Sequence, residues 1–381
     1  MHFSSLATLY SGSKNRLYAR RDELLGEEKQ IVDLISGNVN KYGILFPEDL
    51  LKDILSEAVR KAEVYEPDSF GQPSARATIA ANYPSWITAD HILLTPGTSV
   101  AYWYCFNLLC ETEDEILCPI PSYPLFDYIA KACGVHVKNY RLIEQRGWMI
   151  DLEHLEDQIS NRTRAIVVLS PHNPTGLVLN STQTDGLTDI ARRHELPIIA
   201  DEVFSEFVFE GQDVRLADSD CPLVFTLNGF SKMFALPGMK IGWVSVSGES
   251  SLVGKALTTL ELLSDTFLPV NEIAQFAIPG VFKKGVKFLE EYRNQISERR
   301  NTALATLQSL DFVTPQGGFY LILPYTRDID EEDLAIELLE EENLLVHPGY
   351  FYDVEDRHLI LSYVQPPTIL EDALLRLRSR L

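Results

Sequence analysis

Short apolar segments alternate with longer helical patterns from about residue 92 onward. Several of these segments are apolar throughout, which is typical of strands that helices cover on both faces. The segments 100–110, 124–133 and 181–194 have helical length and lie between them. This rhythm predicts an α/β fold with a mostly parallel central sheet sandwiched by helices. The expected strands are 91–95, 114–118, 135–140, 164–170, 196–201, 222–228 and 241–247.

The pattern changes after about residue 280. A long charged helical pattern at 281–309 is followed by short apolar runs, an acidic helix at 330–342 and a final helix. This order predicts a smaller α+β domain, whose core we expect to include the segment 30–38. We therefore predict three parts: 1–45 as an N-terminal arm and part of the small domain, 46–280 as the large domain, and 281–381 as the small C-terminal domain.

Composition narrows the class of protein. Of the 381 residues, 45% are hydrophobic, enough for a substantial core and two domains. The net charge of -22 argues against a nucleic-acid partner, which needs clustered positive potential. The five cysteines form no C-x-x-C motif, and the sequence shows no signal-peptide pattern. It also has no apolar run near the ~20 residues of a membrane span. We therefore predict a cytoplasmic protein without a membrane partner. The eight histidines show no H-x-x-x-H spacing, so we predict no metal site.

Small and polar residues follow the first predicted strand, at the kind of strand end where parallel α/β sheets bind ligands. Gly97, Thr98 and Ser99 would open a helix and offer backbone amides and two hydroxyls to an anion. Tyr123 stands between two prolines and would present a rigid, flat ring for stacking. Taken singly, each has a purely structural alternative. Residues 97–99 would then cap a helix, and Tyr123 would be an aromatic residue of the core.

Two further polar residues end buried strands. Asn173 lies in a turn just beyond the strand 164–170, and Asp201 ends the strand 196–201. Each has a purely structural alternative, as a turn residue or a strand-end carboxylate. Their position at the same kind of strand end as Gly97 gives the functional interpretation its weight.

The stretch 226–243 places two lysines between apolar runs. Lys232 follows Phe230 and Ser231, and Lys240 stands eight residues further on. An amine, an anion cradle, a stacking platform and a carboxylate are together what pyridoxal 5′-phosphate requires. The carboxylate keeps the pyridine nitrogen protonated, and the lysine amine holds the aldehyde and later moves a proton on the substrate carbon.

With these residues in place, the chain resembles the class I/II aminotransferases, the fold-type-I pyridoxal-phosphate enzymes typified by aspartate aminotransferase. The resemblance extends over almost the whole chain and implies a large cofactor-binding domain and a homodimer. It implies transfer of an amino group from an amino acid to a 2-oxo acid through a Schiff base at Lys232. It rests on YEPDSFGQPSARATIA (65–80), TPGTS (95–99), PSYP (121–124), HNPTG (172–176), ADEVF (200–204), FSKMFALPGMKIGW (230–243) and TPQGGFY (314–320).

Carried over residue by residue, the resemblance makes Lys232 the Schiff-base lysine and general acid/base, and Asp201 the partner of the pyridine nitrogen. Asn173 would bond the phenolic oxygen, and Tyr123 would stack on the ring. Tyr65 would reach the phosphate of the neighbouring subunit's site, which implies shared active sites. The other implied residues are Gly97, Thr98, Ser99 and Lys240 at the phosphate, Ser231 beside them in the cofactor site, and Gly37 in the substrate carboxylate pocket.

Three departures from the family pattern loosen cofactor binding without removing the chemistry. Phe204 stands where the family usually has a tyrosine, and the loss of one neutral hydrogen bond costs about 0.5–1.5 kcal/mol. Gly229 replaces a serine that contacts the phosphate. Lys240 replaces an arginine, which exchanges a bidentate fork for a point charge.

The fourth departure concerns the substrate. Ile360 occupies the place of the arginine that grips the substrate's α-carboxylate in the family. Arg357 is the substrate-binding candidate nearest in sequence, although three residues along a strand usually point to opposite faces, and His358 shares the face of Ile360. Either the alignment slips or another arginine enters, or the substrate or reaction differs. The alternative function is a pyridoxal-phosphate-dependent lyase or cyclase of specialised amino-acid metabolism.

The N-terminal segment 6–22 carries four basic residues, Lys14, Arg16, Arg20 and Arg21. In this family the N-terminal arm contributes to the pocket for the substrate side chain, so these residues could contact an acidic substrate. We expect instead a solvated arm. The sequence does not name the substrate.

Overall fold

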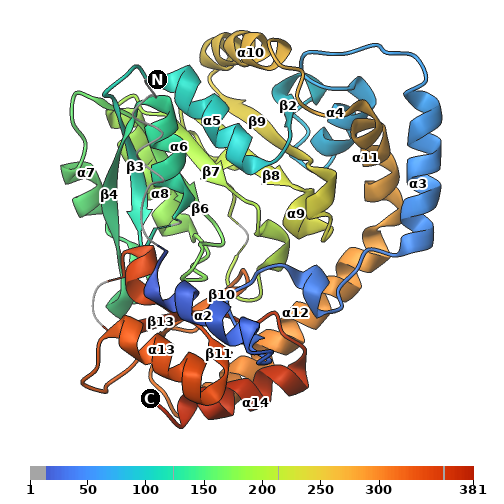
Figure 1. Ribbon diagram of the computed structural model, residues 1–381. Coiled ribbons are helices and arrows are strands. Elements are labelled where there is room, and N and C mark those ends of the chain that lie inside the picture. Colours follow the sequence, from blue (N-terminus) through green and yellow to red (C-terminus); the bar gives the residue numbers. More distant parts are fainter. Residues whose placement is uncertain (1–13, 123, 213, 355–356) are drawn as a thin grey trace, which may run out of the picture.

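The apolar segments between residues 91 and 248 form one eight-stranded sheet, as the alternation predicts (Figure 1). The computed structural model describes residues 14–381 except 123, 213, 355 and 356. The strands are β2 (Ile92–Thr95), β3 (Glu115–Ile120), β4 (His136–Ile143), β5 (Met149–Ile150), β6 (Thr163–Leu169), β7 (Ile198–Asp201), β8 (Leu223–Gly229) and β9 (Gly242–Gly248). Their order is β2-β9-β8-β7-β6-β3-β4-β5, and the run from β8 to β4 is parallel throughout.

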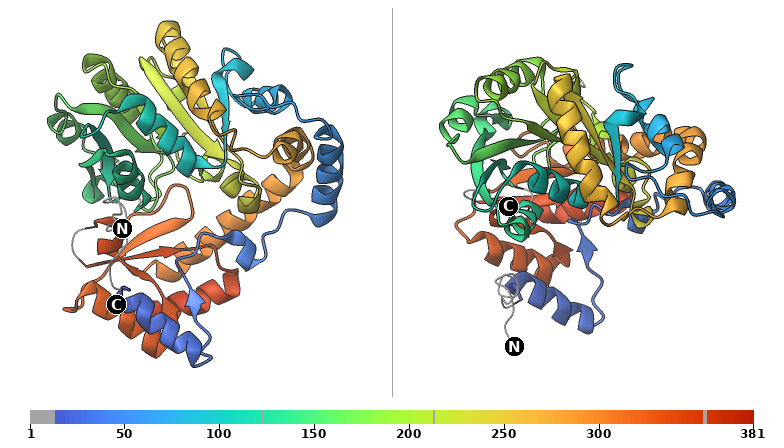
Figure 2. Two further views of the ribbon diagram at one scale, coloured as in Figure 1. Left: turned by 45° about the horizontal axis from the view of Figure 1, so that its top comes forward. Right: turned by 90° about the horizontal axis from the view of Figure 1, so that it is seen from above.

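Helices cover both faces of this sheet. Val167 and Val168 are neighbours on β6, so their side chains point to opposite faces, and both are buried. Val167 packs in a cluster with α5, α6 and α10, whereas Val168 packs with α7 and α8 (Figures 1 and 2). The helices of this part are α3 (Glu48–Lys61), α4 (Pro73–Ala80), α5 (Thr98–Leu109), α6 (Leu125–Cys133), α7 (Leu152–Asp157), α8 (Ser181–Arg193), α9 (Phe230–Met233), α10 (Ser250–Asp265) and α11 (Glu272–Lys284).

A smaller layer of strands and helices lies below the large sheet in Figure 1. It contains α2 (Arg16–Gly26), β1 (Val32–Asp33), α12 (Val286–Leu307), β10 (Tyr320–Pro324), α13 (Glu331–Glu342), β11 (Leu344–Leu345), β12 (His347–Pro348), β13 (His358–Ser362) and α14 (Pro367–Arg378). The strands β10, β13 and β12 form an antiparallel sheet, and β1 pairs in parallel with β11. The prediction that the segment 30–38 joins this core is therefore confirmed.

The charged pattern predicted as one helix over 281–309 is two helices that meet at Gly285. A Cβ at this position would lie 3.0 Å from the ring of Phe46 and 3.1 Å from that of Phe234. Only glycine fits this close approach, and the chain changes direction there. The domain boundaries at residues 45 and 280 stay a prediction. Among the described residues, no helix is both long and apolar enough to cross a bilayer.

The N-terminal segment is not a solvated arm over the part that the structure describes. Residues from Arg16 onward form α2, which packs on α13. The guanidinium of Arg16 lies 2.8 Å from the Asp333 carboxylate, and that of Arg20 lies 2.6 Å from the Glu340 carboxylate. The sequence pattern missed this helix because its ionic partners lie more than 300 residues away.

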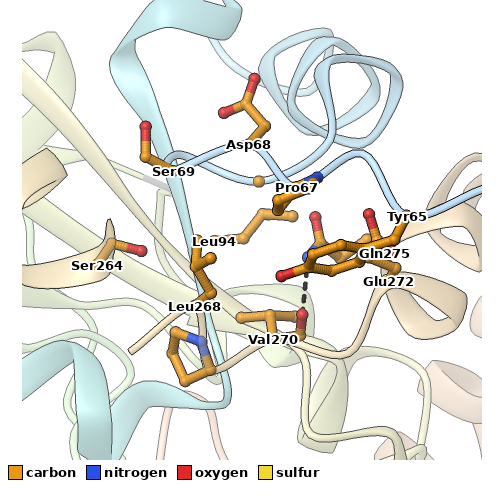
Figure 3. A pocket seen from close by; sticks show the side chains of 12 residues that line it. Tyr65, Pro67, Asp68, Ser69, Leu94, Ser264, Leu268, Val270, Glu272 and Gln275 are labelled. Carbon is orange, nitrogen blue, oxygen red and sulfur yellow. Dashed lines mark hydrogen bonds between the residues drawn. The ribbon is translucent and has the colours of Figure 1, made fainter. Parts of the chain in front are cut away.

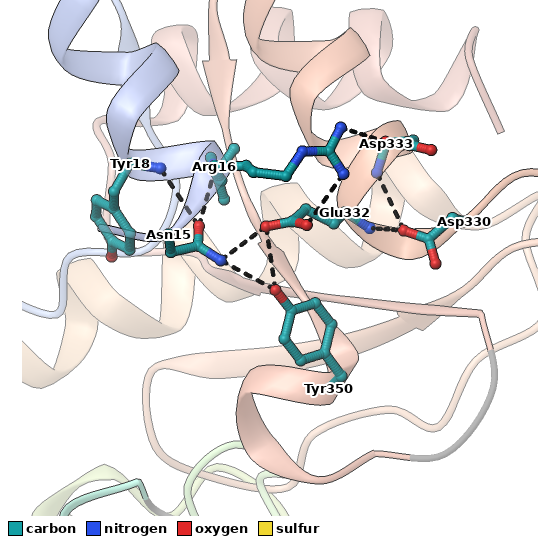
Figure 4. Close-up of polar contacts among 8 residues, drawn as sticks. Asn15, Arg16, Tyr18, Asp330, Glu332, Asp333 and Tyr350 are labelled. Carbon is teal, nitrogen blue, oxygen red and sulfur yellow. Dashed lines mark hydrogen bonds and ion pairs between the residues drawn. The ribbon is translucent and has the colours of Figure 1, made fainter. Parts of the chain in front are cut away.

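Asn15 connects the start of α2 to α13 (Figure 4). Its side-chain oxygen accepts from the Leu17 backbone amide at 2.9 Å, which caps the helix. Its side-chain nitrogen donates to the Glu332 carboxylate at 2.7 Å and to the Tyr350 hydroxyl at 3.0 Å. The Asn15 side chain thus caps the first turn of α2 and attaches this helix to the small domain.

We expect Asn15→Ala to lower the free energy of unfolding by about 1–2 kcal/mol, because a helix cap and a partly buried hydrogen bond are lost together. Urea unfolding followed by circular dichroism measures this. Arg16→Ala is the matched control. Its ion pairs lie at the surface, so we expect a change below about 0.5 kcal/mol. Equal effects of the two substitutions would contradict the capping role.

Candidate active site

Three predicted polar residues meet at one edge of the large sheet. Because β6, β7 and β8 are adjacent and parallel, their carboxyl ends lie side by side. Asn173 follows β6, Asp201 is the last residue of β7, and Lys232 lies in the short helix α9 directly after β8. The arrangement places an amide, a carboxylate and an amine at one edge of the sheet, as the strand-end argument predicts.

The amine of Lys232 points toward the small domain. Its Nζ donates to the backbone carbonyl of Gly37 at 3.2 Å, across the boundary between the large sheet and the N-terminal segment. Burial lowers the pKa of this amine to about 8, because a low-dielectric surrounding disfavours its charged form. About a tenth of the amine is therefore neutral, and thus nucleophilic, at pH 7.

Two aromatic rings, those of Phe204 and Phe319, lie beside this amine. Lys232 Nζ lies 5.5 Å from the ring centroid of Phe204 and 5.6 Å from that of Phe319. The two rings pack edge to face with centroids 4.9 Å apart, and Phe207 extends the group behind Phe319. The rings exclude water from one side of the amine and still offer π faces to its charged form.

The carboxylate of Asp201 is buried at the end of β7. Tyr102 of α5 donates its hydroxyl to one carboxylate oxygen at 2.8 Å, and the Val203 backbone amide donates to the other at 3.0 Å. Burial raises the pKa of Asp201, and these two hydrogen bonds oppose the rise. A cation beside the carboxylate would stabilise its ionised form further.

Asn173 brings an unused acceptor to the same edge. Its side-chain oxygen is buried and accepts no hydrogen bond from the residues that the structure describes. The neighbouring His172 is buried against the Thr175 hydroxyl, and burial lowers the pKa of its imidazole to about 3. His172 is therefore neutral at physiological pH and adds no charge to the site.

The segment after β2, where we predict an anion cradle, forms the start of a helix. Gly97 has a φ of +122°, a conformation that favours glycine, and directly precedes the twelve-residue helix α5, which begins at Thr98. A Cβ at Gly97 would lie 3.9 Å from Lys240 Nζ, so the lysine reaches the start of this helix. Ser99 is exposed in the first turn. Backbone amides at a helix start and a nearby cation suit a phosphate group.

Residues of the small domain, Gly37 and Tyr320, face Lys232 from the side opposite the strand ends of the large sheet. A Cβ on Gly37 would overlap the hydroxyl of Tyr320 and would come within 3.2 Å of Lys232 Nζ. The absence of a side chain at residue 37 thus leaves room for the lysine amine and the tyrosine hydroxyl at one place. Tyr320 also packs edge to face on Phe204, with ring centroids 6.3 Å apart.

Other predicted residues lie differently. Tyr123 is outside the described residues, and Ser231 lies beside Lys232 in α9. Tyr65 is 69% exposed in a small pocket beside Gln275 (Figure 3). Arg357 is half-exposed, and its guanidinium lies 2.7 Å from the Asp328 carboxylate in a shallow surface pocket. No described contact joins Arg357 to the group around Lys232, and its role as a substrate ligand stays a prediction.

The structure shows how two of the residues that depart from the family pattern, Ile360 and Gly229, are packed. Ile360 is 1% exposed on β13, directly opposite Ile322 of β10. Gly229 pairs with Gly242 of β9, and a Cβ at Gly229 would come within 2.7 Å of the Ile241 carbonyl. The close approach of these two strands therefore excludes a serine at residue 229.

Sequence reasoning missed three residues of this site. Tyr102, Phe319 and Tyr320 approach Asp201 or Lys232 from elements far away in the sequence. Tyr102 lies one helical turn after Thr98, which is the only local signal for it. Phe319 and Tyr320 belong to the segment 314–320, which resembles the family, but the resemblance gives neither of them a role.

Known proteins resemble the chain over most of its length. The family described as aminotransferase class I and II matches residues 31–369. Alanine aminotransferase of Mycobacterium tuberculosis is 31% identical over 344 residues, which cover 86% of this chain and 79% of that protein. Tyrosine aminotransferase of Dictyostelium discoideum is 28% identical over 353 residues, or 86% and 83% of the two chains. A solved alanine aminotransferase from Pyrococcus furiosus superimposes with a TM-score of 0.91 at 25% identity and covers 99% of each chain.

The lowered pKa of Lys232 predicts how its reactivity depends on pH. Reductive methylation of the cofactor-free protein should modify Lys232 with a rate that rises about tenfold per pH unit below pH 8 and levels off above it. Quantitative mass spectrometry of the digested protein measures the rate. Lys287 is exposed and serves as the internal control for reagent and digestion. A rate for Lys232 that keeps rising well above pH 8 would contradict the effect of burial.

Proposed function

The chain belongs to the class I and II aminotransferases, which depend on pyridoxal 5′-phosphate, and we propose that Lys232 is the residue at which it carries out amino-group transfer. The donor in this proposal is an amino acid and the acceptor a 2-oxo acid. The observation that supports it best is the partly buried Lys232 amine, with its pKa of about 8, one strand away from the buried Asp201 carboxylate.

The residues present suit the cofactor. Gly97, with Lys240 near the place of its missing Cβ, forms a cradle for the phosphate together with Thr98 and Ser99. The side-chain oxygen of Asn173, without a partner among the described residues, offers hydrogen bonding for a ring substituent. When bound, pyridoxal phosphate supplies an aldehyde that amines attack and a ring that accepts electrons.

Lys232 has two tasks in this proposal. Its neutral amine would hold the cofactor aldehyde in the resting enzyme and, when free, would move a proton at the substrate carbon. A pKa near the working pH suits both tasks, because proton acceptance and donation are then about equally accessible. The carbonyl of Gly37, at 3.2 Å, orients the amine whenever it is free.

Asp201 fixes the electronic state of the ring. Its carboxylate is held in place by Tyr102 and the Val203 amide, and it would bond the pyridine nitrogen and keep it protonated. Tyr123 would stack on the ring and Ser231 would complete the cofactor site. Gly37 would line the substrate carboxylate pocket.

The comparisons do not favour the lyase or cyclase alternative, since the relatives carry the names of alanine, tyrosine and glutamate-pyruvate aminotransferases. These names support small α-amino acids or aromatic amino acids as donors for this chain. We propose a cytoplasmic location, on the composition and the cysteines described above.

The visible absorbance of the purified protein loaded with pyridoxal phosphate tests this function. Titration with a panel of amino acids should remove the absorbance of the resting form, and a 2-oxo acid should restore it. Lys232→Ala should lower the rate of this cycle about a thousandfold or more, because both the aldehyde partner and the proton carrier are lost.

Lys255→Ala is the matched control, because this lysine is exposed on α10, and it should leave the cycle unchanged. A spectral shift without loss and recovery of the resting absorbance would point to the lyase or cyclase instead. Full activity of Lys232→Ala would overturn the assignment.

We also propose a homodimer with shared active sites. Val64 and Tyr65 are 64% and 69% exposed, and Leu262 and Phe267 are 68% and 63% exposed. Tyr65 lines one pocket with Ser264 and residues 268–270, so these apolar groups belong to one region of the surface (Figure 3). Exposed apolar groups gathered in this way support a protein–protein interface, across which Tyr65 would reach the partner's phosphate.

Phe267→Asp should therefore weaken the dimer at least tenfold, because a charge would be buried in an apolar contact. Sedimentation equilibrium measures the dissociation constant. Leu25→Asp, at a 51% exposed position on α2, is the control and should leave the dimer intact. A wild-type protein that sediments as a monomer at micromolar concentration would refute the proposal.

A further inference from the structure

One face of the small antiparallel sheet points toward the active site. In the pairing of β10 with β13, Tyr320 lies opposite Ser362 and Ile322 lies opposite Ile360, so these four side chains share a face. Ile322 and Ile360 pack in the same apolar cluster as residues of β6 and β7 in the large sheet. This face is therefore the wall that the small domain presents to the strand ends.

The hydroxyl of Tyr320 is a polar group of this wall that lies close to the reacting amine. The position of a Cβ on Gly37 would overlap this hydroxyl and would lie 3.2 Å from Lys232 Nζ. An amino acid carries its carboxylate on the same carbon as its amino group. A substrate whose amino group replaces the amine of Lys232 thus brings its carboxylate to the neighbourhood of Gly37 and Tyr320.

Three arginines of the small domain, Arg299, Arg300 and Arg357, are held elsewhere. Arg357 pairs with Asp328 at the surface. Arg299 donates to the backbone carbonyl of Val364 and, at 3.1 Å, to that of Tyr42.

The buried guanidinium of Arg300 donates to the carbonyl of Pro315 at 2.7 Å and pairs with Glu210. On the wall itself, His358 lies 3.3 Å from the Glu144 carboxylate, and the next residue on the same face is Ile360. None of these contacts delivers a guanidinium to the place beside Gly37.

We infer that the Tyr320 hydroxyl, beside Gly37, holds the substrate carboxylate in place of a guanidinium. This inference rests on the proposed amino-group transfer at Lys232. A neutral hydroxyl donates a hydrogen bond to a carboxylate and to a carboxamide oxygen alike, whereas a guanidinium strongly prefers the anion. The substrates are therefore α-amino acids together with their neutral carboxamides.

The test compares L-amino acids with their carboxamides in the half-reaction of the loaded dimeric enzyme, followed by the absorbance of the bound cofactor. For the best pair, kcat/KM of acid and amide should differ by less than about tenfold. Ile360→Arg should raise the preference for the acid at least tenfold, since it places a guanidinium on the same wall. A wild-type preference for the acid above about a thousandfold would overturn the inference and indicate a cation, such as one from the partner subunit.

Tyr320→Phe separates a binding role from a structural one. It keeps the ring that packs on Phe204 and removes only the hydroxyl. We expect KM for the amino acid to rise about tenfold while kcat and the absorbance of the bound cofactor change less than about threefold.

Tyr325→Phe is the matched control, because this tyrosine follows β10 but bonds the Ile329 carbonyl in a surface pocket away from Lys232. An unchanged KM in Tyr320→Phe would refute the role of the hydroxyl. If the loaded enzyme converts neither member of any pair, the proposed function itself fails and the inference with it.

Discussion

The burial of one lysine amine imposes most of the other requirements on this structure. An amine taken out of water needs a hydrogen-bond acceptor, and Lys232 finds it in the carbonyl of Gly37, 195 residues earlier in the chain. For that carbonyl to be in place, the small domain must hold the N-terminal segment next to the strand ends of the large sheet. The pairing of β1 with β11, and the bond from the Ser362 amide to the Leu34 carbonyl at 2.6 Å, hold it there.

The aromatic group around the amine serves the same requirement. Phe204 and Phe319 come from the two domains and meet edge to face, so both rings line one side of Lys232 only when the domains are joined. The substitution of tyrosine by Phe204 is consistent with this arrangement. It gives up one hydroxyl in the proposed cofactor site and keeps the ring that packs on Phe319.

The strands and the strand-end residues could be predicted because they follow from local rules. Continuous apolar runs identify buried strands, and the parallel order then brings Asn173, Asp201 and Lys232 to one edge. The break at Gly285 could not be predicted, because it depends on the distant rings of Phe46 and Phe234. The same is true of α2, whose charges are matched by α13, and of Tyr102 and Tyr320, whose roles arise only when separate elements meet.

The connection between β8 and β9 has a mechanical consequence. Lys232 and Lys240 lie within the twelve residues that join these two antiparallel neighbours, so the shared ladder of β8 and β9 sets the separation of their backbones. Gly37 and Tyr320, in contrast, belong to the small domain. A displacement of the small domain would thus widen the substrate wall and leave the distance between the two lysines unaltered. In the proposed function, this connection would keep the spacing of the reacting lysine and the phosphate-binding lysine unchanged while the substrate side moves.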